Sequence, residues 1–461
     1  MLCKYKPNGV DAKAAFAAVC GRTEIIMYED YVSAGAKELC GKTDSETIQN
    51  AIRTAVESGV RTVVIPRFCA RTGLEYWEID KAILLPSDIT VILDNCRLRL
   101  KDGIYDNVFR NENMFTEISN KADGKQHNIR IIGIGKAVLD GGLKNDLWEW
   151  NSGKDGMPDI RMNNLIFFHN LTEYELTGFS CINMRHWAIN QLYCSNGHVS
   201  NIHFDLETYN NNQDGVNVRC GCHNIIIENI TGLTGDDVVA LTAFPCGGEK
   251  KYAVEGETPD IHHITIRNVL AHTRQTIVAL RNCDGAKLHH VYIENISEAE
   301  GSLGPWGVLR IGENNYYTKR PSILGETYNI HARGIFSLTR GTVYLGGALS
   351  DSTICDVYAG GDTMHAVTSF YEEFTAEWAN NAQGYAGVSM KNVLFQNIHY
   401  DGAAKYDETL VGFPGDTGCA LDFRCMREEH TLENVIFRDI FTRENAPVCL
   451  CKDGLALDIR K

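Results

Sequence analysis

A short segment recurs through the middle and the carboxyl-terminal half of the chain, and it limits the fold more than any other feature. Each copy is a β-branched or aromatic run followed by a polar residue, then Asn or Asp, then an apolar residue, as in HNIIIENI from residue 223. A repeat of about 20–50 residues built from strands and turns is typical of a solenoid, whose stacked coils bury one continuous core. The segment therefore predicts an all-β fold, a β-solenoid, and irregular gaps between copies disfavour a sandwich or a propeller. The repeated turn residues are Asp205, Asn229, Asn268, Asn295, Asn397 and Asp439.

The amino-terminal part has a different pattern, which predicts one helix. Apolar residues follow the helical spacing of three and four from Ile48 to Val56. Thr43 or Asp44 stands where a cap begins the helix, and Gly59 stands where it ends. Such an amphipathic helix would cover the open end of a solenoid, whose strand edges otherwise invite aggregation.

Two groups of motifs resemble a known family. Residues 33–68 (with VVIP near the end of this stretch), ILLPSDITVILDNCRLRL and IIGIGKAVLDGG resemble the opening of pectin-degrading β-helix proteins. NNNQDGVNV and GLTGDDVVAL resemble the polygalacturonases of glycoside hydrolase family 28. The resemblance covers roughly residues 30–440 and implies a right-handed, single-stranded parallel β-helix with an N-terminal capping helix. We expect a single domain over residues 1–461, with a cap to about residue 75, coils over about 76–445, and a tail over 446–461.

Three acids in these motifs are the candidate catalytic residues. Asp214 precedes the pair Asp236 and Asp237 by about one coil, so the three are expected to meet on one wall. Packing like charges together raises at least one pKa and keeps a proton near neutral pH, which glycosidic hydrolysis requires. The resemblance implies inversion, with Asp236 as the general acid and Asp214 and Asp237 activating water. Asn212 belongs to the same motif and is expected to bind substrate.

Two further motifs of the family are altered. Arg274, Gln275 and Thr276 occupy the place of a Gly-His-Gly, and nearby His272 is a weak candidate for the missing histidine. Of an Arg-Ile-Lys that holds the substrate carboxylate in the family, this chain keeps Arg310 and Ile311 but has Gly312 instead of Lys. A lost cation weakens the prediction of a uronate substrate, unless Arg274 or Arg281 supplies the charge. The alternative is a neutral sugar.

Aromatic side chains and two insertions complete the candidate site. Sugar faces stack on aromatic rings, although any one ring more often serves ordinary packing. Residues 243–260 and 313–329 interrupt the repeat beside the candidate site, and we hypothesise that they close one end of a groove and favour exo-action. The candidate stacking residues are Trp306, Tyr316, Tyr317 and Tyr344.

Bulk properties restrict the partners. A net charge of −15 argues against nucleic acid, and no apolar run is long enough to cross a membrane. The 16 cysteines are scattered, which favours free thiols in a reducing compartment over a disulfide scaffold. No signal-peptide pattern is seen, so we expect a cytoplasmic protein, or an extracellular one whose signal has been removed. We expect an oligo- or polysaccharide partner and no metal or cofactor, and leave homo-oligomer formation open.

Two other functions fit the same residues. A β-helix lyase or epimerase would use the three acids to bind calcium, which prefers carboxylate oxygens. A non-catalytic carbohydrate-binding solenoid would need none of the acids for chemistry. The altered His and Lys motifs keep both alternatives open.

Overall fold

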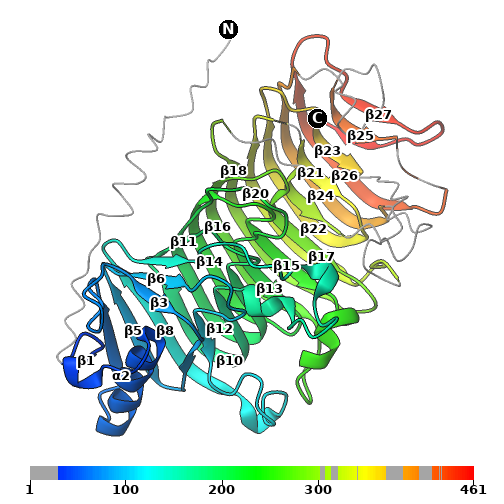
Figure 1. The fold of residues 1–461 in the computed structure, drawn as a ribbon. Coiled ribbons are helices and arrows are strands. Elements are labelled where there is room, and N and C mark those ends of the chain that lie inside the picture. The colour runs from blue at the N-terminus through cyan, green and yellow to red at the C-terminus, as the bar shows by residue number, and fades with distance from the viewer. Residues whose placement is uncertain are drawn as a thin grey trace.

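The chain folds into one long stack of parallel strands (Figure 1). The computed structural model describes residues 30–301, 307–312, 320–339, 341–369, 388–403, 418–424, 426 and 428–461. Every printed pairing between named strands is parallel, from β1 (Val32–Ser33) on β2 (Thr62–Pro66) to β26 (Leu432–Thr442) on β28 (Asp458–Arg460). The predicted right-handed parallel β-helix is therefore confirmed. Among the described residues, no helix is long and apolar enough to cross a membrane.

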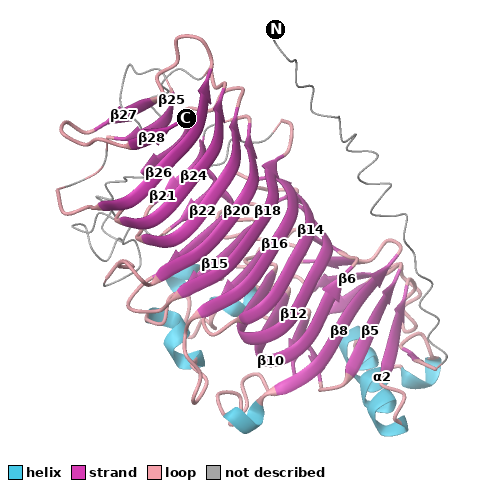
Figure 2. Ribbon diagram, turned by 180° about the vertical axis from the view of Figure 1, so that it is seen from behind, coloured by secondary structure: helices cyan, strands magenta, loops and turns pink. Residues whose placement is uncertain are grey.

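Each coil contributes one long strand and one or two short strands. The long strands form one side of the stack, as Figure 2 shows. They are β5 (Ile89–Asp94), β8 (Gln126–Ile134), β10 (Ile166–Thr177), β12 (Ile189–Asp205), β14 (His223–Leu233), β16 (Ile261–His272), β18 (Leu288–Glu298), β20 (Thr327–Ser337), β22 (Leu349–Ala359), β24 (Met390–Tyr400) and the already named β2 and β26.

The short strands form the other walls. The wall that carries the candidate site contains β4 (Ile83–Leu85), β7 (Phe109–Asn111), β13 (Val216–Arg219), β15 (Val239–Ala243), β17 (Thr276–Asn282), β19 (Gly307–Ile311), β21 (Gly341–Leu345), β23 (His365–Ser369), β25 (Cys419–Phe423) and β27 (Cys449–Cys451). A third wall, confined to the early coils, contains β3 (Trp77–Ile79), β6 (Arg97–Leu100), β9 (Val138–Asp140) and β11 (Ser180–Ile182). The 3₁₀ turns are η1 (Lys37–Leu39), η2 (Ala122–Gly124), η3 (Glu149–Asn151), η4 (Ile160–Asn163) and η5 (Gly247–Tyr252).

The core follows from the alternation of side chains along each strand. Val239 and Leu241 of β15 point inward and belong to the continuous hydrophobic core, whereas Ala240 between them does not. The same alternation in β17 sends Val278 and Leu280 inward. Outward positions of these short strands therefore lie in rows across neighbouring coils, and these rows form the wall on which the acids lie.

A ladder of asparagines bends four successive long strands, β12 to β18, at one corner. Asn229, Asn268 and Asn295 have φ values of 57°, 56° and 56°, in the left-handed region that Asn tolerates better than most residues. The Asn268 amide donates to Asn229 Oδ1 at 3.1 Å, and the Asn229 amide donates to Asn201 Oδ1 at 3.1 Å. The prediction of a stacked turn residue is confirmed for these asparagines. It is wrong for Asp205, because the register pairs Ser200 with Glu228 and so places Asn201 on the ladder.

The predicted capping helix is α2 (Asp44–Ser58), which packs against β1–β4 at the amino-terminal end of the stack (Figure 1). Thr43 caps it by accepting from the Glu46 N–H at 3.2 Å. Gly59 ends it with a φ of 77°, which glycine adopts without strain. Asp44 is instead buried and accepts from the Glu78 N–H at 2.8 Å and from Arg71 Nε at 2.7 Å, so it ties the helix to the first coils.

Candidate active site

The three acids lie in two turns that stand one above the other. β13 and β15 are adjacent parallel strands, with Val216 paired to Val239. Counting back two residues places Asp214 in line with Asp237, and Asp236 in line with Gln213. The Gly215 N–H donates to the Asp237 carbonyl at 3.0 Å, which holds the two turns together. The structure therefore brings Asp214 and the Asp236–Asp237 pair onto one wall, as the motif spacing predicts.

Asp214 and Asp237 form the buried floor of this cluster. Each of these residues is 3% exposed. Asp214 Oδ2 accepts from Asn217 Nδ2 at 3.1 Å, and Asn217 is the next outward residue on β13. Asp237 Oδ2 lies 3.4 Å from Arg281 Nη2, which comes from β17 of the following coil. One arginine thus faces the acids from the neighbouring coil.

Asp236 is the acid that solvent reaches, because it is half-buried. Its two carboxylate oxygens accept backbone N–H groups, from Asn212 at 2.9 Å and from Asp237 at 3.0 Å. Its carbonyl accepts the Thr234 and Thr273 hydroxyls at 2.6 and 2.7 Å. These bonds fix the turn, so the orientation of the Asp236 carboxyl is set by the backbone of two coils.

The environment keeps a proton in the cluster. Burial, together with repulsion from Asp237, raises the pKa of Asp236 to about 7. Burial, followed by repulsion from Asp236 and Asp237, raises the pKa of Asp214 well above its usual range. Arg281 opposes both shifts. A wall with three carboxyl groups and one facing guanidinium can therefore hold both protonated and ionised oxygens near neutral pH.

The structure places the residues of the altered Gly-His-Gly motif in the turn before β17. The register of β15 on β17, with Val239 paired to Val278, puts Thr276 in line with Asp214 and Asp237. Gln275 is half-buried and lies in line with Asp236, and its N–H donates to Thr273 Oγ1 at 3.1 Å. His272 ends β16, where its carbonyl accepts the Thr234 N–H at 3.1 Å. Asp214, Asp237 and Thr276 therefore form one row.

The side chains of two predicted residues, Arg274 and Asn212, have partners other than the acids. The Arg274 guanidinium lies 4.8 Å from the ring centroid of Tyr209 and is exposed. Asn212 has a φ of 62°, and its contact with Asp236 uses the backbone N–H rather than the side chain. Burial and then Asp236 raise the pKa of Tyr209 to about 12, so the phenol remains neutral beside the acids.

The altered Arg-Ile-Lys motif lies one coil further along. Leu280 pairs with Ile311, so Arg281 and Gly312 are neighbours at the same position of successive coils. Arg281 therefore places a cation one coil before the position where the family has Lys. Arg310 is half-buried, and its neighbours across the wall are Ala279 on one side and Tyr344 on the other. Trp306, Tyr316 and Tyr317 lie outside the described residues.

The wall on the amino-terminal side of the acids was missed by the sequence analysis. Trp187 precedes Ala188, whose N–H donates to the Asp214 carbonyl at 2.9 Å. The Arg219 guanidinium lies 4.4 Å from the Trp187 ring and forms a buried ion pair with Glu249 of the insertion. Arg161 Nη2 lies 3.4 Å from the same Glu249 oxygen. The first insertion therefore folds back over the earlier coils.

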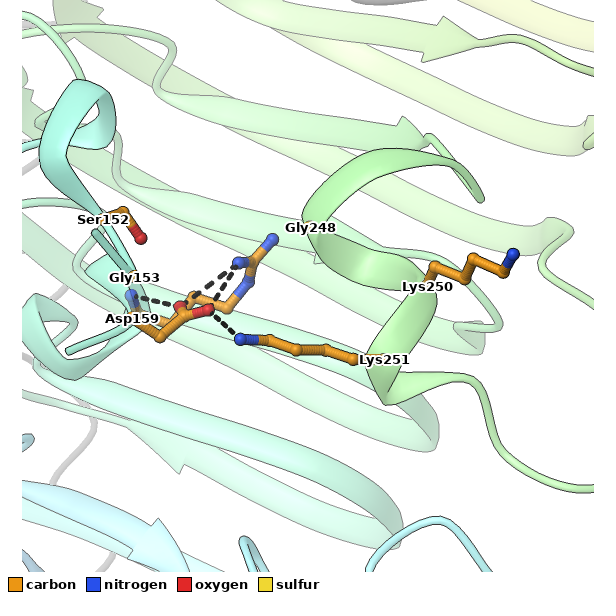
Figure 3. Close-up of a pocket in the computed structure, with 7 residues that line it drawn as sticks. Ser152, Gly153, Asp159, Gly248, Lys250 and Lys251 are labelled. Atoms are coloured by element: carbon orange, nitrogen blue, oxygen red, sulfur yellow. Dashed lines mark hydrogen bonds and ion pairs between the residues drawn. The ribbon is translucent and has the colours of Figure 1, made fainter. Parts of the chain in front are cut away.

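A cavity of about 570 Å³ lies next to this wall. Arg161, Asp159 and Lys251 meet in it, with the Lys251 ammonium 2.5 Å from Asp159 Oδ2, as Figure 3 shows. None of the three acids lines the cavity. Two of its cations, Arg161 and Lys251, are paired with Asp159 and Glu249, so we do not assign it to the reaction. The full lining is Ser152, Gly153, Asp159, Arg161, Gly248, Lys250 and Lys251.

The three acids do not form a compact cation cage. Among the described residues, two groups of three or more ligating side chains have all their ligand atoms within 4.8 Å of one another, and neither contains Asp214, Asp236 or Asp237. Calcium takes six to eight oxygens at about 2.3–2.6 Å, so its ligand oxygens crowd together. The arrangement therefore disfavours calcium binding by these acids.

Comparisons with known proteins agree with this architecture and define a class, the parallel β-helix proteins. The chain is 12% identical to the A-module of mannuronan C-5 epimerase AlgE4 from Azotobacter vinelandii, with a TM-score of 0.58 over 94% of this chain and 99% of that chain. It is 11% identical to PfbA, a surface adhesin of Streptococcus pneumoniae, with a TM-score of 0.50 over 91% and 92%. An exopolygalacturonase from Thermotoga maritima is 14% identical, with a TM-score of 0.49 over 94% and 91%. At these identities, the structural likeness shows the fold alone.

A match to a protein family comes from the amino-acid sequence rather than from the structural likeness. Residues 81–258 match the model of glycosyl hydrolases family 28, and this segment contains all three acids. The chain therefore carries a segment, 178 of its 461 residues, that matches the glycosyl hydrolases of family 28. No curated protein sequence matches it.

Proposed function

We propose that the protein is an inverting glycosidase that cleaves pectin-type oligosaccharides, with Asp236 as the general acid and Asp214 and Asp237 activating water. The observation that carries this proposal is the cluster itself, in which three carboxyl groups from two coils meet beside Arg281. Asp236 alone of the three is half-buried rather than buried, so its carboxyl is the one a substrate reaches.

The proposed reaction uses each acid once. The Asp236 carboxyl donates its proton to the glycosidic oxygen as the bond from that oxygen to the anomeric carbon breaks. Asp214 or Asp237 accepts a proton from a water molecule, whose oxygen attacks the anomeric carbon from the opposite face. The proton then returns to Asp236 through solvent. Inversion results because attack and departure take place on opposite faces.

The match to family 28, rather than the distance between the acids, supports inversion over retention. Inverting enzymes keep their carboxyl groups about 6.5–9.5 Å apart to leave room for water, and retaining enzymes about 5–5.5 Å. The three carboxylates do not all come within 4.8 Å of one another, a limit that lies below both ranges. The same observation weighs against a calcium-dependent lyase or epimerase that uses these residues.

The charges beside the acids support an anionic sugar. Arg281 and Arg310 both point outward from adjacent coils, on the side of the acids toward the carboxyl-terminal end of the stack. Guanidinium groups bind carboxylates by two parallel hydrogen bonds, which suits the carboxylate of a uronate. Arg281 replaces, from one coil earlier, the charge that Gly312 lacks.

The folded-back insertion supports exo-action. Glu249, Arg219 and Trp187 close the amino-terminal side of the wall immediately beside Asp214. A sugar chain bound across the acids would end against this closure and extend toward Arg310 and Tyr344. We therefore expect oligosaccharides to be shortened from one end, and equal rates of internal cleavage of long polymers would rule this out.

The leaving group of the substrate provides the sharpest test. Asp236→Asn and Asp214→Asn are each compared on a galacturonate oligosaccharide and on a nitrophenyl galacturonide, whose leaving group departs without protonation. We expect both variants to lose at least about 1,000-fold in kcat on the oligosaccharide. Only Asp236→Asn should recover most of this loss on the nitrophenyl substrate, because only it lacks the proton donor.

Two outcomes would contradict the assignment. Recovery by Asp214→Asn instead would exchange the roles of the two acids. Wild-type activity of both variants, with folding verified by circular dichroism, would show that neither acid carries the reaction. Nuclear magnetic resonance of the first product formed distinguishes inversion from retention, since the anomeric proton reports the configuration before mutarotation.

A further inference from the structure

A second cluster lies at the base of the insertion, outside the proposed catalytic wall. Cys246 begins the insertion after β15, and Cys283 with Asp284 follows β17 on the next coil. The Cys246 thiol donates to Asp284 Oδ2 at 2.7 Å, and the Cys283 thiol lies 3.6 Å from the same oxygen. The two thiols also hydrogen-bond to each other. Two sulfurs and one carboxylate oxygen therefore converge on one point.

The surroundings suit a bound cation. The three ligand atoms all lie within 4.8 Å of one another. Cys283 is buried, whereas Cys246 and Asp284 are half-buried, so an ion can enter from solvent. The other Asp284 oxygen accepts the Arg320 N–H at 2.8 Å, which orients the carboxylate as outer partners do for metal ligands.

One cation, Arg320, lies near the cluster, with its guanidinium paired to Glu326. The Arg320 guanidinium interacts electrostatically with both Asp284 and Cys283. A divalent cation would replace both thiol protons, which pass to solvent, and the charges of two thiolates, one carboxylate and one cation would leave a single negative charge beside Arg320.

From this geometry we infer that Cys246, Cys283 and Asp284 form a site for a thiophilic divalent cation, Zn²⁺. Thiolates select soft or borderline ions over calcium and magnesium, and zinc accepts two Cys and one Asp with a fourth position for water. The bound ion would join the start of the insertion to the next coil. It would thereby brace the segment whose Glu249 closes the wall beside Asp214.

The second group with ligand atoms in range differs in a way that makes it a control. His365, Cys419 and Asp422 also lie within 4.8 Å of one another. Arg424, however, already binds Asp422 through both oxygens, with Nε at 3.0 Å from Oδ1 and Nη2 at 2.6 Å from Oδ2. A cation there would displace an arginine from its carboxylate. We therefore do not propose a metal site at that group.

The test measures metal content and thiolate ligation in the full chain. Reduced protein is loaded with Zn²⁺, desalted and measured by elemental analysis, and a parallel sample is loaded with Co²⁺. We expect one equivalent of zinc and a near-ultraviolet sulfur-to-cobalt charge-transfer band. Cys246→Ser and Cys283→Ser should each lose the band and bind zinc at least about 100-fold more weakly, and Asp284→Asn about 10-fold. Cys40→Ser and Cys419→Ser should bind as the unchanged protein does.

The wild-type cobalt spectrum keeps the inference testable even if a cysteine variant does not fold. Absence of the band in the wild-type protein would overturn the site, as would equal zinc binding by folded Cys246→Ser. A Cys246–Cys283 disulfide that forms in air and persists when Zn²⁺ is present would overturn it in favour of a redox pair. None of these results depends on glycosidase activity.

Discussion

Two turns of the same coils can be compared directly. At the corner of the long strands, Asn201, Asn229, Asn268 and Asn295 repeat one residue type, one backbone conformation and one side-chain hydrogen bond. At the turn before the short strands, the same coils carry Asp214, then Asp237, then Thr276 in one row. The first turn repeats its chemistry on these four coils, whereas the second changes from Asp to Thr within three.

The difference separates stability from function within one architecture. A repeated polar residue satisfies its neighbours above and below, so each coil of the ladder supports the next. Carboxylates placed in line repel each other, and this cost is tolerated only where Arg281 faces them and the backbone of the turn holds them. The coil position that departs from the repeat is therefore where chemistry is expected. Substitutions in the asparagine ladder should lower stability and leave kcat unchanged, whereas substitutions around the acids should mainly lower kcat.

Among the substitutions that test this comparison, Arg281→Met should have the largest effect. This change removes the cation that lowers the pKa of both Asp214 and Asp236, so both pKa values should rise. We expect kcat to fall about 100-fold, or about 2.7 kcal/mol, through loss of the ionised carboxylate that activates water. In the unchanged enzyme kcat/KM should decline above about pH 7 as Asp236 loses its proton. In Arg281→Met this decline should move to higher pH.

Arg281→Lys is the matched control, because it keeps the charge but not the forked geometry. In Arg281→Lys, kcat/KM should decline at the same pH as in the unchanged enzyme, and kcat should fall less than in Arg281→Met. If kcat/KM of Arg281→Met declined at the same pH or at a lower pH than in the unchanged enzyme, this arginine would not set the charge of the cluster.

A smaller effect, on stability alone, should follow from Asn229→Ala in the ladder. Alanine at a φ of 57° costs about 1 kcal/mol, and the two amide bonds to Asn201 and Asn268 are lost. We expect a destabilisation of about 2 kcal/mol, measured by urea unfolding, with kcat unchanged. Asn229→Gly removes the same hydrogen bonds without the left-handed strain. Its free energy of unfolding should therefore lie between those of the unchanged protein and Asn229→Ala. Equal losses in both variants would assign the whole effect to hydrogen bonding.

The repeated part of the molecule could be predicted from the sequence because it depends on local patterns. The strand runs, the Asn turns and the helix over Asp44–Ser58 each follow from spacing and residue type within one segment. Asp205 shows the limit of this reasoning. Within its own coil it resembles the other turn residues, and only the pairing of β12 with β14 reveals that Asn201 occupies the ladder.

The non-repeated part could be predicted only where a motif marked it. The Asp-Gly and Gly-Asp-Asp motifs identified the acids, but nothing in the sequence of residues 243–260 states the direction in which the insertion folds. Its direction depends on Glu249 meeting Arg161 and Arg219, which come from distant coils. Trp187 lies one coil before Asp214, in line with it, because Ile189 pairs with Val216. It could be found from the sequence only if this register were already known. Long-range ion pairs of this kind leave no local pattern.

The smallest effect should have the opposite sign from the ladder substitution. Asp236→Asn removes a carboxyl whose pKa rises from 3.8 to about 7 on folding. Below pH 3.8 both states hold the proton, and as pH rises to about 7 the native state retains a proton that the unfolded state has lost. The carboxyl therefore costs stability increasingly over this range, and the cost is complete above pH 7. Asparagine carries no charge, so the variant should be more stable than the unchanged protein at pH 8 by about 1–2 kcal/mol.

The magnitude is limited by the partners of Asp236. Its two oxygens accept N–H groups from Asn212 and Asp237, and an asparagine amide can accept only one of them. This lost bond is present at every pH, whereas the relief of buried charge is present only where the carboxyl would be ionised. Urea unfolding at pH 4 and pH 8 separates the two terms, since the gain should vanish or reverse at pH 4. An equal gain at both values would show that packing, rather than charge, distinguishes this turn from the asparagine ladder.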